Sequence, residues 1–414
     1  MAWYVQCLPV TRLLLNDDLL DAQLVRAVGA AGYGGADLGE CIAAARRLDE
    51  RDLGSWYEEW TATATAVARL AEQKVAAGNR ESARLAFLRA CTYHRTAGVM
   101  LLGEPLDQRL VSAYRAQADM FAAALDLMEL PVERIEIPVG NIRLPGYFLS
   151  AAADGRRRAT VILTGGYDGT VEELYFANGA AALARGYNVL AFDGPGQGRV
   201  LTEQRQVIRS DWENVITPVL DYALRRADVD AERIALIGLS LGAHLAPRAA
   251  SVEHRLAACV ADCGGFDLYD AFLARLPGPL ANPSMLIRPR VRDGLARILD
   301  RLAAKPTAGW VLRRGMLVHG VSDPLAYVDA LREFTLKDRA SRIRCPTWVC
   351  SAEGDAISAS APQLVDALTC EKTYVRFTAA EGAGDHCEQA ARQLYHARSF
   401  GWLDSRLRPS HSTG

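Results

Sequence analysis

The spacing of hydrophobic positions along this chain changes near residue 130. Before that point, apolar residues recur every three or four positions, which is the period of a helix with one buried face. In the segment 52–77 these positions are Trp56, Trp60, Ala64, Val67 and Leu70. The segment 80–102 repeats the period, and strand-like runs are few. We therefore predict a separate α-helical domain over residues 1–130, with these side chains in its core.

From Val132 onward the hydrophobic pattern is that of strands. Runs at 133–138 and 142–149 predict an antiparallel hairpin. Short apolar runs then alternate with helical segments, and these runs are 159–163, 187–192, 234–239, 258–262, 346–351 and 373–378. Alternation of strand and helix predicts a mainly parallel sheet covered by helices. The expected fold class is therefore α/β, with eight strands.

The segment 266–340 interrupts this alternation after the sixth strand. It contains Leu-Pro-Gly-Pro-Leu, a helical stretch rich in arginine and Val-Ser-Asp-Pro-Leu. We interpret it as a helical cap inserted into a core formed by 131–265 and 341–407, with a disordered tail at 408–414. Its arginines predict a solvated helix face rather than an anion site; they are Arg288, Arg290, Arg292, Arg297 and Arg301.

Ser240 carries the strongest chemical signal in the sequence. Residues 234–242 read Ile-Ala-Leu-Ile-Gly-Leu-Ser-Leu-Gly, so the serine lies between Gly238 and Gly242. It follows an apolar run and precedes an alanine-rich helical stretch, which is the context of a nucleophile elbow. In such a turn small neighbours let the backbone pack closely and the serine hydroxyl points into a cleft. The pattern predicts a nucleophilic serine.

A nucleophilic serine needs a base and an acid, which in this type of fold follow it along the chain. His386 lies in a glycine-containing loop after the last predicted strand, whereas the other histidines fall in helices, charged stretches or the tail. Asp355 follows the preceding strand and a glycine that lets the chain turn. Glu353, closer to the strand end, is the reserve candidate for the acid.

An oxyanion hole requires two backbone N–H groups. Leu241, directly after the serine, is the first candidate donor. The strand at 159–163 leads into Thr164-Gly-Gly-Tyr-Asp-Gly169, where Tyr167 or Gly166 is the second. Asp168 in the same loop is a candidate for lining the substrate site. A phosphate-binding loop is not indicated, because G-x-G-x-x-G and Gly-Lys-Ser/Thr are both missing.

Composition narrows the class of protein further. The 414 residues are 50% hydrophobic and 23% charged, with a net charge of -2, which offers no electrostatic argument for nucleic acid or an anionic membrane. No apolar run is long enough for a membrane span, and the first residues do not read as a signal peptide, so we expect a cytoplasmic protein. The nine cysteines are scattered without C-x-x-C pairs and predict reduced, buried thiols. We expect no cofactor and no metal.

Several segments together resemble the α/β-hydrolase superfamily, and specifically the FrsA-like branch. That branch includes 2,6-dihydroxypseudooxynicotine hydrolase and fungal polyketide-shortening hydrolases of pigment biosynthesis. The segments that carry the resemblance are Ser82–Arg95, Gly165–Thr170, Phe192–Gly198, the turn at Ser240 and Gly382–Cys387. The resemblance implies an α/β-hydrolase fold behind a helical domain. It also implies a triad of Ser240, Asp355 and His386.

Several further residues are candidates for positions in the cleft. A helical domain over the mouth must contribute some lining, for which Tyr93, His94 and Arg95 are candidates. Some relatives have an additional cleft carboxylate, and Asp262 or Asp267 is near the right place to supply it. Either could also be an ordinary residue at a strand end or in the cap.

The resemblance implies a serine hydrolase acting on a carbonyl of a polyketide-like or aromatic ketone, by C–C bond or acyl-group hydrolysis. A carboxylesterase is the alternative that shares this machinery. A lyase or cyclase of secondary metabolism, or a binding protein on the same scaffold, is the alternative of another class. The expected partner is a small-molecule substrate, and a homodimer through the apolar face of the N-terminal helices is left open.

Overall fold

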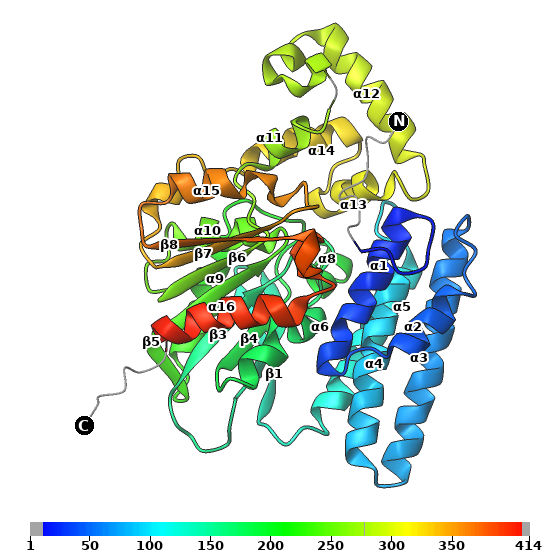
Figure 1. Cartoon of the computed structure of the whole chain (residues 1–414), viewed down its shortest axis with the longest axis vertical. Helices are drawn as coiled ribbons and strands as arrows, with labels where there is room; N and C mark the ends of the chain where they lie inside the picture. Colours follow the sequence, from blue (N-terminus) through cyan, green and yellow to red (C-terminus); the bar gives the residue numbers. More distant parts are fainter. Residues whose placement is uncertain (1–10, 277, 408–414) are drawn as a thin grey trace.

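The computed structural model describes residues 11–276 and 278–407, in which a group of N-terminal helices stands beside a sheet and a smaller helical group covers one end (Figure 1). The N-terminal helices are α1 (Asp18–Gly29), α2 (Leu38–Ala45), α3 (Leu53–Ala76), α4 (Arg80–Val99) and α5 (Gln108–Leu125). Four of them begin after an aspartate whose carboxylate accepts backbone N–H groups of the first turn. These caps are Asp17, Asp37, Asp52 and Asp107.

The core of these helices contains the aromatic residues predicted from the hydrophobic period. Trp56 and Trp60 are fully buried, and the Trp56 indole donates a hydrogen bond of 2.7 Å to the carbonyl of Thr96 on α4. Leu70 was expected on the same buried face but is 37% exposed. The error has a simple cause, because the buried face of α3 continues from Val67 by four residues to Ala71, and Leu70 lies beside that face.

The sheet has eight strands in the order β1-β2-β4-β3-β5-β6-β7-β8. Their bounds are β1 (Val132–Val139), β2 (Ile142–Leu149), β3 (Arg158–Thr164), β4 (Asn188–Phe192), β5 (Val229–Leu239), β6 (Ala258–Asp262), β7 (Thr347–Ala352) and β8 (Lys372–Phe377). The pairs β1/β2 and β2/β4 are antiparallel, whereas the other pairs are parallel. The predicted α/β class, hairpin and mainly parallel sheet are therefore confirmed.

Helices cover the sheet where the chain crosses between parallel strands (Figure 1). They are α6 (Val171–Leu174), α7 (Ala180–Leu183), α8 (Gly198–Thr202), α9 (Glu213–Leu224), α10 (Gly242–Ala250), α15 (Ala361–Ala367) and α16 (Arg392–Leu407). A π-helical turn at Tyr175–Gly179 joins α6 and α7. The carboxylate of Asp193, after β4, accepts the N–H groups of Val171 and Arg199 and so fixes the starts of α6 and α8.

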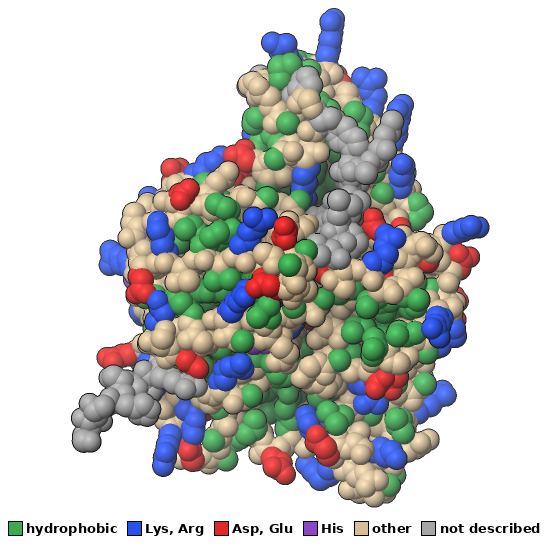
Figure 2. Space-filling model, viewed as in Figure 1, with side chains coloured by type: hydrophobic (Ala, Val, Ile, Leu, Met, Phe, Trp, Pro, Cys, Tyr) green, Lys and Arg blue, Asp and Glu red, His purple; other side chains and the backbone are tan. Residues whose placement is uncertain are grey.

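The helical cap is inserted between β6 and β7. It comprises α11 (Leu268–Leu273), α12 (Pro289–Ala303), α13 (Trp310–His319) and α14 (Pro324–Ala330). Its helices share a small core of their own, including Leu273, Leu295 and Leu312. Figure 2 shows Lys and Arg side chains projecting from this end of the molecule. The Trp310 indole donates to the carbonyl of Val99 at 2.9 Å, which ties the cap to α4.

The division of the chain into domains at residues 130, 265 and 340 stays a prediction. The first of these boundaries falls between α5 and β1, and the second between β6 and α11. The predicted disordered tail at 408–414 lies outside the described residues. Within the parts of the chain that are described, no helix combines the length and apolar character needed to cross a membrane.

Candidate active site

Ser240 lies on a sharp turn between the end of β5 and the start of α10. Its φ is +61°, in the left-handed region that a side chain rarely adopts. The two flanking glycines are required by close packing: a Cβ on Gly238 would overlap the Gly242 carbonyl, and one on Gly242 would overlap the Thr164 carbonyl. The apolar run before the serine therefore ends in a strained turn that holds the hydroxyl at the edge of the sheet.

His386 and Asp355 form a hydrogen-bonded chain with this serine. His386 Nε2 lies 2.8 Å from Ser240 Oγ, and Nδ1 lies 2.8 Å from Asp355 Oδ2. The aspartate is 3% exposed, and its carboxylate also accepts the N–H of Ile357. Glu353, the reserve candidate, is exposed and accepts the N–H of Ala379 instead. The structure thus pairs His386 with Asp355 and not with Glu353.

The electrostatics of the pair favour a charged imidazole. Burial by itself would lower the pKa of His386, but the Asp355 carboxylate next to Nδ1, together with a smaller contribution from Cys263, outweighs it and raises that pKa to about 10. A proton taken up by Nε2 is therefore held firmly, because the imidazolium forms against a fixed negative charge.

The loop after β3 brings its glycines against the serine. An ideal Cβ on Gly166 would lie 3.0 Å from Ser240 Oγ and 3.2 Å from the Leu241 nitrogen, so only glycine permits this approach. Within the described residues, the N–H groups of Leu241 and Tyr167 have no protein acceptor. The Tyr167 hydroxyl is hydrogen-bonded to His319 Nε2 of the cap at 2.9 Å.

A cavity of about 430 Å³ opens in front of Ser240. One side, which we call the serine wall, is formed by Ser240, Leu241, His386 and Cys387. Side chains of the cap, most of them apolar, cover the cavity; they include Leu268, Phe272, Leu276, Val311, Tyr327 and Leu331. The third side faces the N-terminal helices and is strongly charged. The site can therefore hold a mainly apolar molecule that also carries polar groups.

The charged side is an ion-pair network that we call the arginine wall. It joins Arg26 of α1, Arg95 of α4 and Arg314 of α13 to Asp168 and Glu173. Asp168 lies 2.9 Å from Arg26, 3.6 Å from Arg95 and 3.5 Å from Arg314. Burial would raise the pKa of Asp168, but the three guanidinium groups, Arg26 foremost, hold it well below its usual range. One loop thus holds α1, α4 and the cap together.

Several predicted lining residues lie elsewhere. Tyr93 and His94 are not among the described residues that line the cavity, whereas Arg95 is. Tyr93 is buried against α2, where its hydroxyl donates to Glu40 at 2.7 Å, because it lies on the opposite face of α4. Asp267 caps α11 and pairs with Lys337 at 3.1 Å.

Asp262 is fully buried behind the site, where Arg392 contacts it at 2.8 Å. Neither Asp262 nor Asp267 belongs to the cavity lining within the described chain. Asp168 does line the cavity, as predicted for the substrate site, but it is committed to the arginine wall. The sequence analysis missed Arg26, Glu173 and Arg314, since no local motif marks them.

Comparison with known proteins identifies the family to which this chain belongs. The model of the Alpha/beta hydrolase family matches residues 161–397. The 20-hydroxy-prefusarin hydrolase FUS2 of Gibberella moniliformis is 34% identical over 406 residues, covering 94% of this chain and 96% of that protein. The chain belongs to the α/β-hydrolase family. The hydrolase acrC of Aspergillus aculeatus is 32% identical, with 96% of this chain and 98% of that protein covered.

A solved α/β-hydrolase structure agrees in overall fold. The 2,6-dihydroxy-pseudo-oxynicotine hydrolase superposes with a TM-score of 0.74 at 23% identity, covering 92% of this chain and 96% of that one. The resemblance seen in the sequence motifs is confirmed by these matches. The protein is a hydrolase of the α/β-hydrolase superfamily.

Proposed function

We propose that this hydrolase uses Ser240 as its nucleophile, His386 as its general base and Asp355 to orient and stabilise the imidazolium. The observation that carries the proposal is the continuous chain of 2.8 Å contacts from Asp355 through His386 to Ser240 Oγ at the edge of the cavity. These contacts have the geometry that proton transfer from a serine hydroxyl requires.

In the first half of the reaction, Ser240 Oγ attacks the substrate carbonyl while its proton passes to His386 Nε2. The negative charge on the carbonyl oxygen is stabilised by the N–H groups of Leu241 and Tyr167, with Gly166 as the reserve donor, and these N–H groups have no acceptor among the described residues. His386 then gives the proton to the leaving atom, and the acyl group stays on the serine. In the second half, water attacks the acyl carbon while its proton passes to His386 Nε2. His386 then returns this proton to Ser240 Oγ as the acyl–oxygen bond breaks, so that the acid product leaves and the serine hydroxyl is restored.

The substrate class that we propose is a polyketide-like or aromatic ketone, hydrolysed at a C–C bond or at another acyl group. The mainly apolar cap side of the cavity favours such a molecule, and the arginine wall offers donors for its oxygens. The relatives named as a 20-hydroxy-prefusarin hydrolase and a 2,6-dihydroxy-pseudo-oxynicotine hydrolase support a substrate with several oxygen functions. C–C cleavage requires a proton for the departing carbon, which His386 Nε2 supplies.

The deciding experiment incubates the purified protein with a panel of β-diketones and aromatic ketones and, in parallel, with p-nitrophenyl esters. We expect cleavage of a diketone with a mass gain of one water across the products. Turnover of esters alone would replace the ketone assignment with a carboxylesterase, and a product of unchanged mass would indicate a cyclase. A fluorophosphonate probe should label the wild type and not Ser240→Ala, while Ser251→Ala serves as the matched control.

A further inference from the structure

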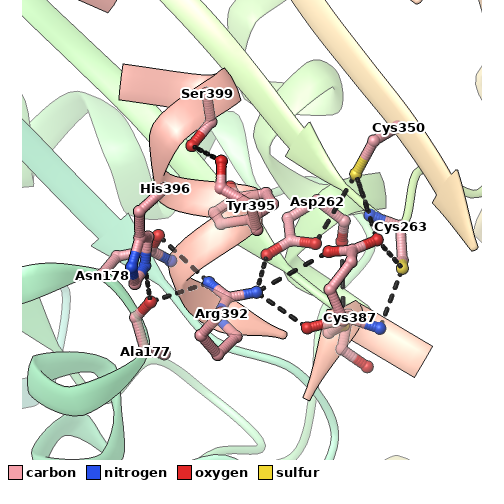
Figure 3. A network of polar contacts seen from close by, with 12 residues as sticks. Ala177, Asn178, Asp262, Cys263, Cys350, Cys387, Arg392, Tyr395, His396 and Ser399 are labelled. Atoms are coloured by element: carbon pink, nitrogen blue, oxygen red, sulfur yellow. Dashed lines mark hydrogen bonds and ion pairs between the residues drawn. The ribbon is translucent and has the colours of Figure 1, made fainter. Parts of the chain in front are cut away.

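Cys387 of the serine wall belongs to a group of cysteine side chains from three segments (Figure 3). Cys263 directly follows β6, Cys350 lies on β7 and Cys387 follows His386 in the loop before α16. The backbone N–H of Cys387 donates to Cys263 Sγ at 2.9 Å. Arg392 reinforces this arrangement, because its Nη1 donates at 2.8 Å to both Asp262 and the Cys387 carbonyl. The fold therefore fixes two sulfur atoms beside the histidine.

The geometry of this group matches a tetrahedral metal site. Cys387 Sγ lies 3.5 Å from His386 Nε2, and these two atoms and Cys263 Sγ all lie within 4.8 Å of one another. With Zn–S near 2.3 Å and Zn–N near 2.0–2.1 Å, the sulfur-to-nitrogen edge of a zinc tetrahedron is about 3.6 Å. We propose that Cys263, Cys387 and His386 Nε2 bind a thiophilic divalent cation of the zinc type, and that its binding inhibits hydrolysis.

Charge and hydrogen bonding favour this occupant. Binding of the dication displaces to solvent the two thiol protons and any proton on His386 Nε2, and the two thiolates then neutralise the charge of the dication. Asp355 accepts the hydrogen bond of His386 Nδ1 at 2.8 Å, which is the contact that a zinc-bound histidine usually makes on its other nitrogen. The other ligand, Cys263 Sγ, is also held by a hydrogen bond, which the backbone N–H of Cys387 donates.

The cation also has a route of access. His386 and Cys387 both line the cavity, so a cation can reach these ligands from the space in front of Ser240. Inhibition follows directly, because the lone pair of Nε2 that would accept the serine proton is the one that binds the cation. The inhibition rests on the proposed function, whereas the cation site itself does not.

A neighbouring group in the described chain is a weaker candidate for the same cation. Asp262, Cys263, Cys350 and Glu388 also bring ligand atoms within 4.8 Å of one another. However, the Arg392 guanidinium lies 2.8 Å from Asp262 and 3.8 Å from Glu388, so both carboxylates of this group already share a cation. All four side chains are moreover fully buried and away from the cavity lining.

The test is a titration of the reduced, metal-free full chain with Co²⁺ and then with Zn²⁺. We expect a sulfur-to-cobalt charge-transfer band that saturates at one equivalent and disappears when zinc displaces the cobalt. The band should appear equally in Ser240→Ala, and be lost in Cys387→Ala. Asp355→Asn, which keeps all three ligands, should weaken binding about 10- to 100-fold.

The matched controls are Cys350→Ala, which removes the thiol of the neighbouring group, and Cys259→Ala, a buried cysteine on β6. Both should keep the band and the zinc sensitivity of hydrolysis. Loss of the band in Cys350→Ala with retention in Cys387→Ala would overturn the assignment, as would the absence of any thiolate band. Cobalt binding without loss of hydrolysis would refute the inhibition, and cobalt binding by a protein that hydrolyses nothing would contradict only the proposed function.

Discussion

The serine wall and the arginine wall line the same cavity but are built in different ways. Ser240 and His386 of the serine wall, and Asp355 next to them, follow β5, β8 and β7 of one sheet, so the order of the strands brings them together. The arginine wall draws Arg26 and Arg314 from helices outside the sheet and joins them through one loop carboxylate.

The comparison indicates that the two walls contribute to different properties of the enzyme. A sheet that is hydrogen-bonded across eight strands holds reacting atoms to the tolerance that proton transfer needs. Helices joined by ion pairs can change in sequence without disturbing those atoms. We therefore expect substitutions in the serine wall to abolish chemistry while the fold persists, and substitutions in the arginine wall to act first on stability and on substrate binding.

The largest effect is expected for Ser240→Ala. Removal of Oγ deletes the attacking atom, so kcat with the best substrate should fall by about 10⁴-fold or more. Steady-state kinetics measure the loss, and circular dichroism should show an unchanged fold. Ser251→Ala, at the other end of α10, should keep wild-type kinetics. If Ser240→Ala retains more than a tenth of the activity, Ser240 is not the nucleophile.

The next effect is expected for Asp355→Asn, which should lower kcat about 10³- to 10⁴-fold, because the neutral amide no longer stabilises the imidazolium. In the wild type, kcat/KM should rise with pH toward a pKa of about 10, since His386 must lose its proton to act as a base. In the variant this rise should move to lower pH. An unchanged pH profile in Asp355→Asn would show that the carboxylate does not set the histidine pKa.

The same pKa shift has a consequence for stability. The pKa of His386 is raised from 6.5 to about 10 in the folded protein, so the folded state binds this proton more tightly than the unfolded state. Its contribution to stability is therefore complete below about pH 6.5 and is lost as the pH rises through 10. Denaturant titrations across this window should show a smaller decline in Asp355→Asn than in the wild type.

In the arginine wall, Asp168→Asn removes the carboxylate that three buried guanidinium groups share. We expect the free energy of unfolding to fall by about 3–5 kcal/mol, because the cations stay buried with only Glu173 to balance them. Denaturant titration followed by circular dichroism measures the change. Asp126→Asn, whose exposed carboxylate pairs with Arg134, should cost under about 1 kcal/mol. Equal costs for the two variants would contradict the role given to the network.

The sequence predicted the serine wall and the fold because their signals are local. Gly238 and Gly242 mark the turn around Ser240, and the loop position of His386 follows from the strand before it. The alternation of strand-like and helical runs likewise predicted the eight strands, and the interruption of that alternation at 266–340 predicted the inserted cap. The arginine wall depends on which face of α1, α4 and α13 meets one loop, and hydrophobic spacing does not show which arginine of a polar face turns inward.

Two aspartates show the same limit of sequence-based prediction. Asp267 and Asp168 look alike in the sequence as loop residues near the expected cleft. The first caps a helix by accepting the N–H of Asp270, and the second pairs with guanidinium groups from distant segments. A carboxylate's role is set by the donors that the tertiary fold brings to it, and only the local cap has a signal in the neighbouring residues.

The smallest effect tests the two faces of α4, where Tyr93 and Arg95 lie two residues apart. Tyr93→Phe keeps the ring contact with Trp60 and removes only a hydroxyl that accepts from the Asp37 N–H and donates to Glu40. We expect a loss of about 1–2 kcal/mol in unfolding free energy and an unchanged kcat/KM. Arg95→Gln should instead raise KM, because Arg95 lines the cavity. A tenfold loss of kcat/KM in a folded Tyr93→Phe protein would show that this face of α4 does contribute to the substrate site.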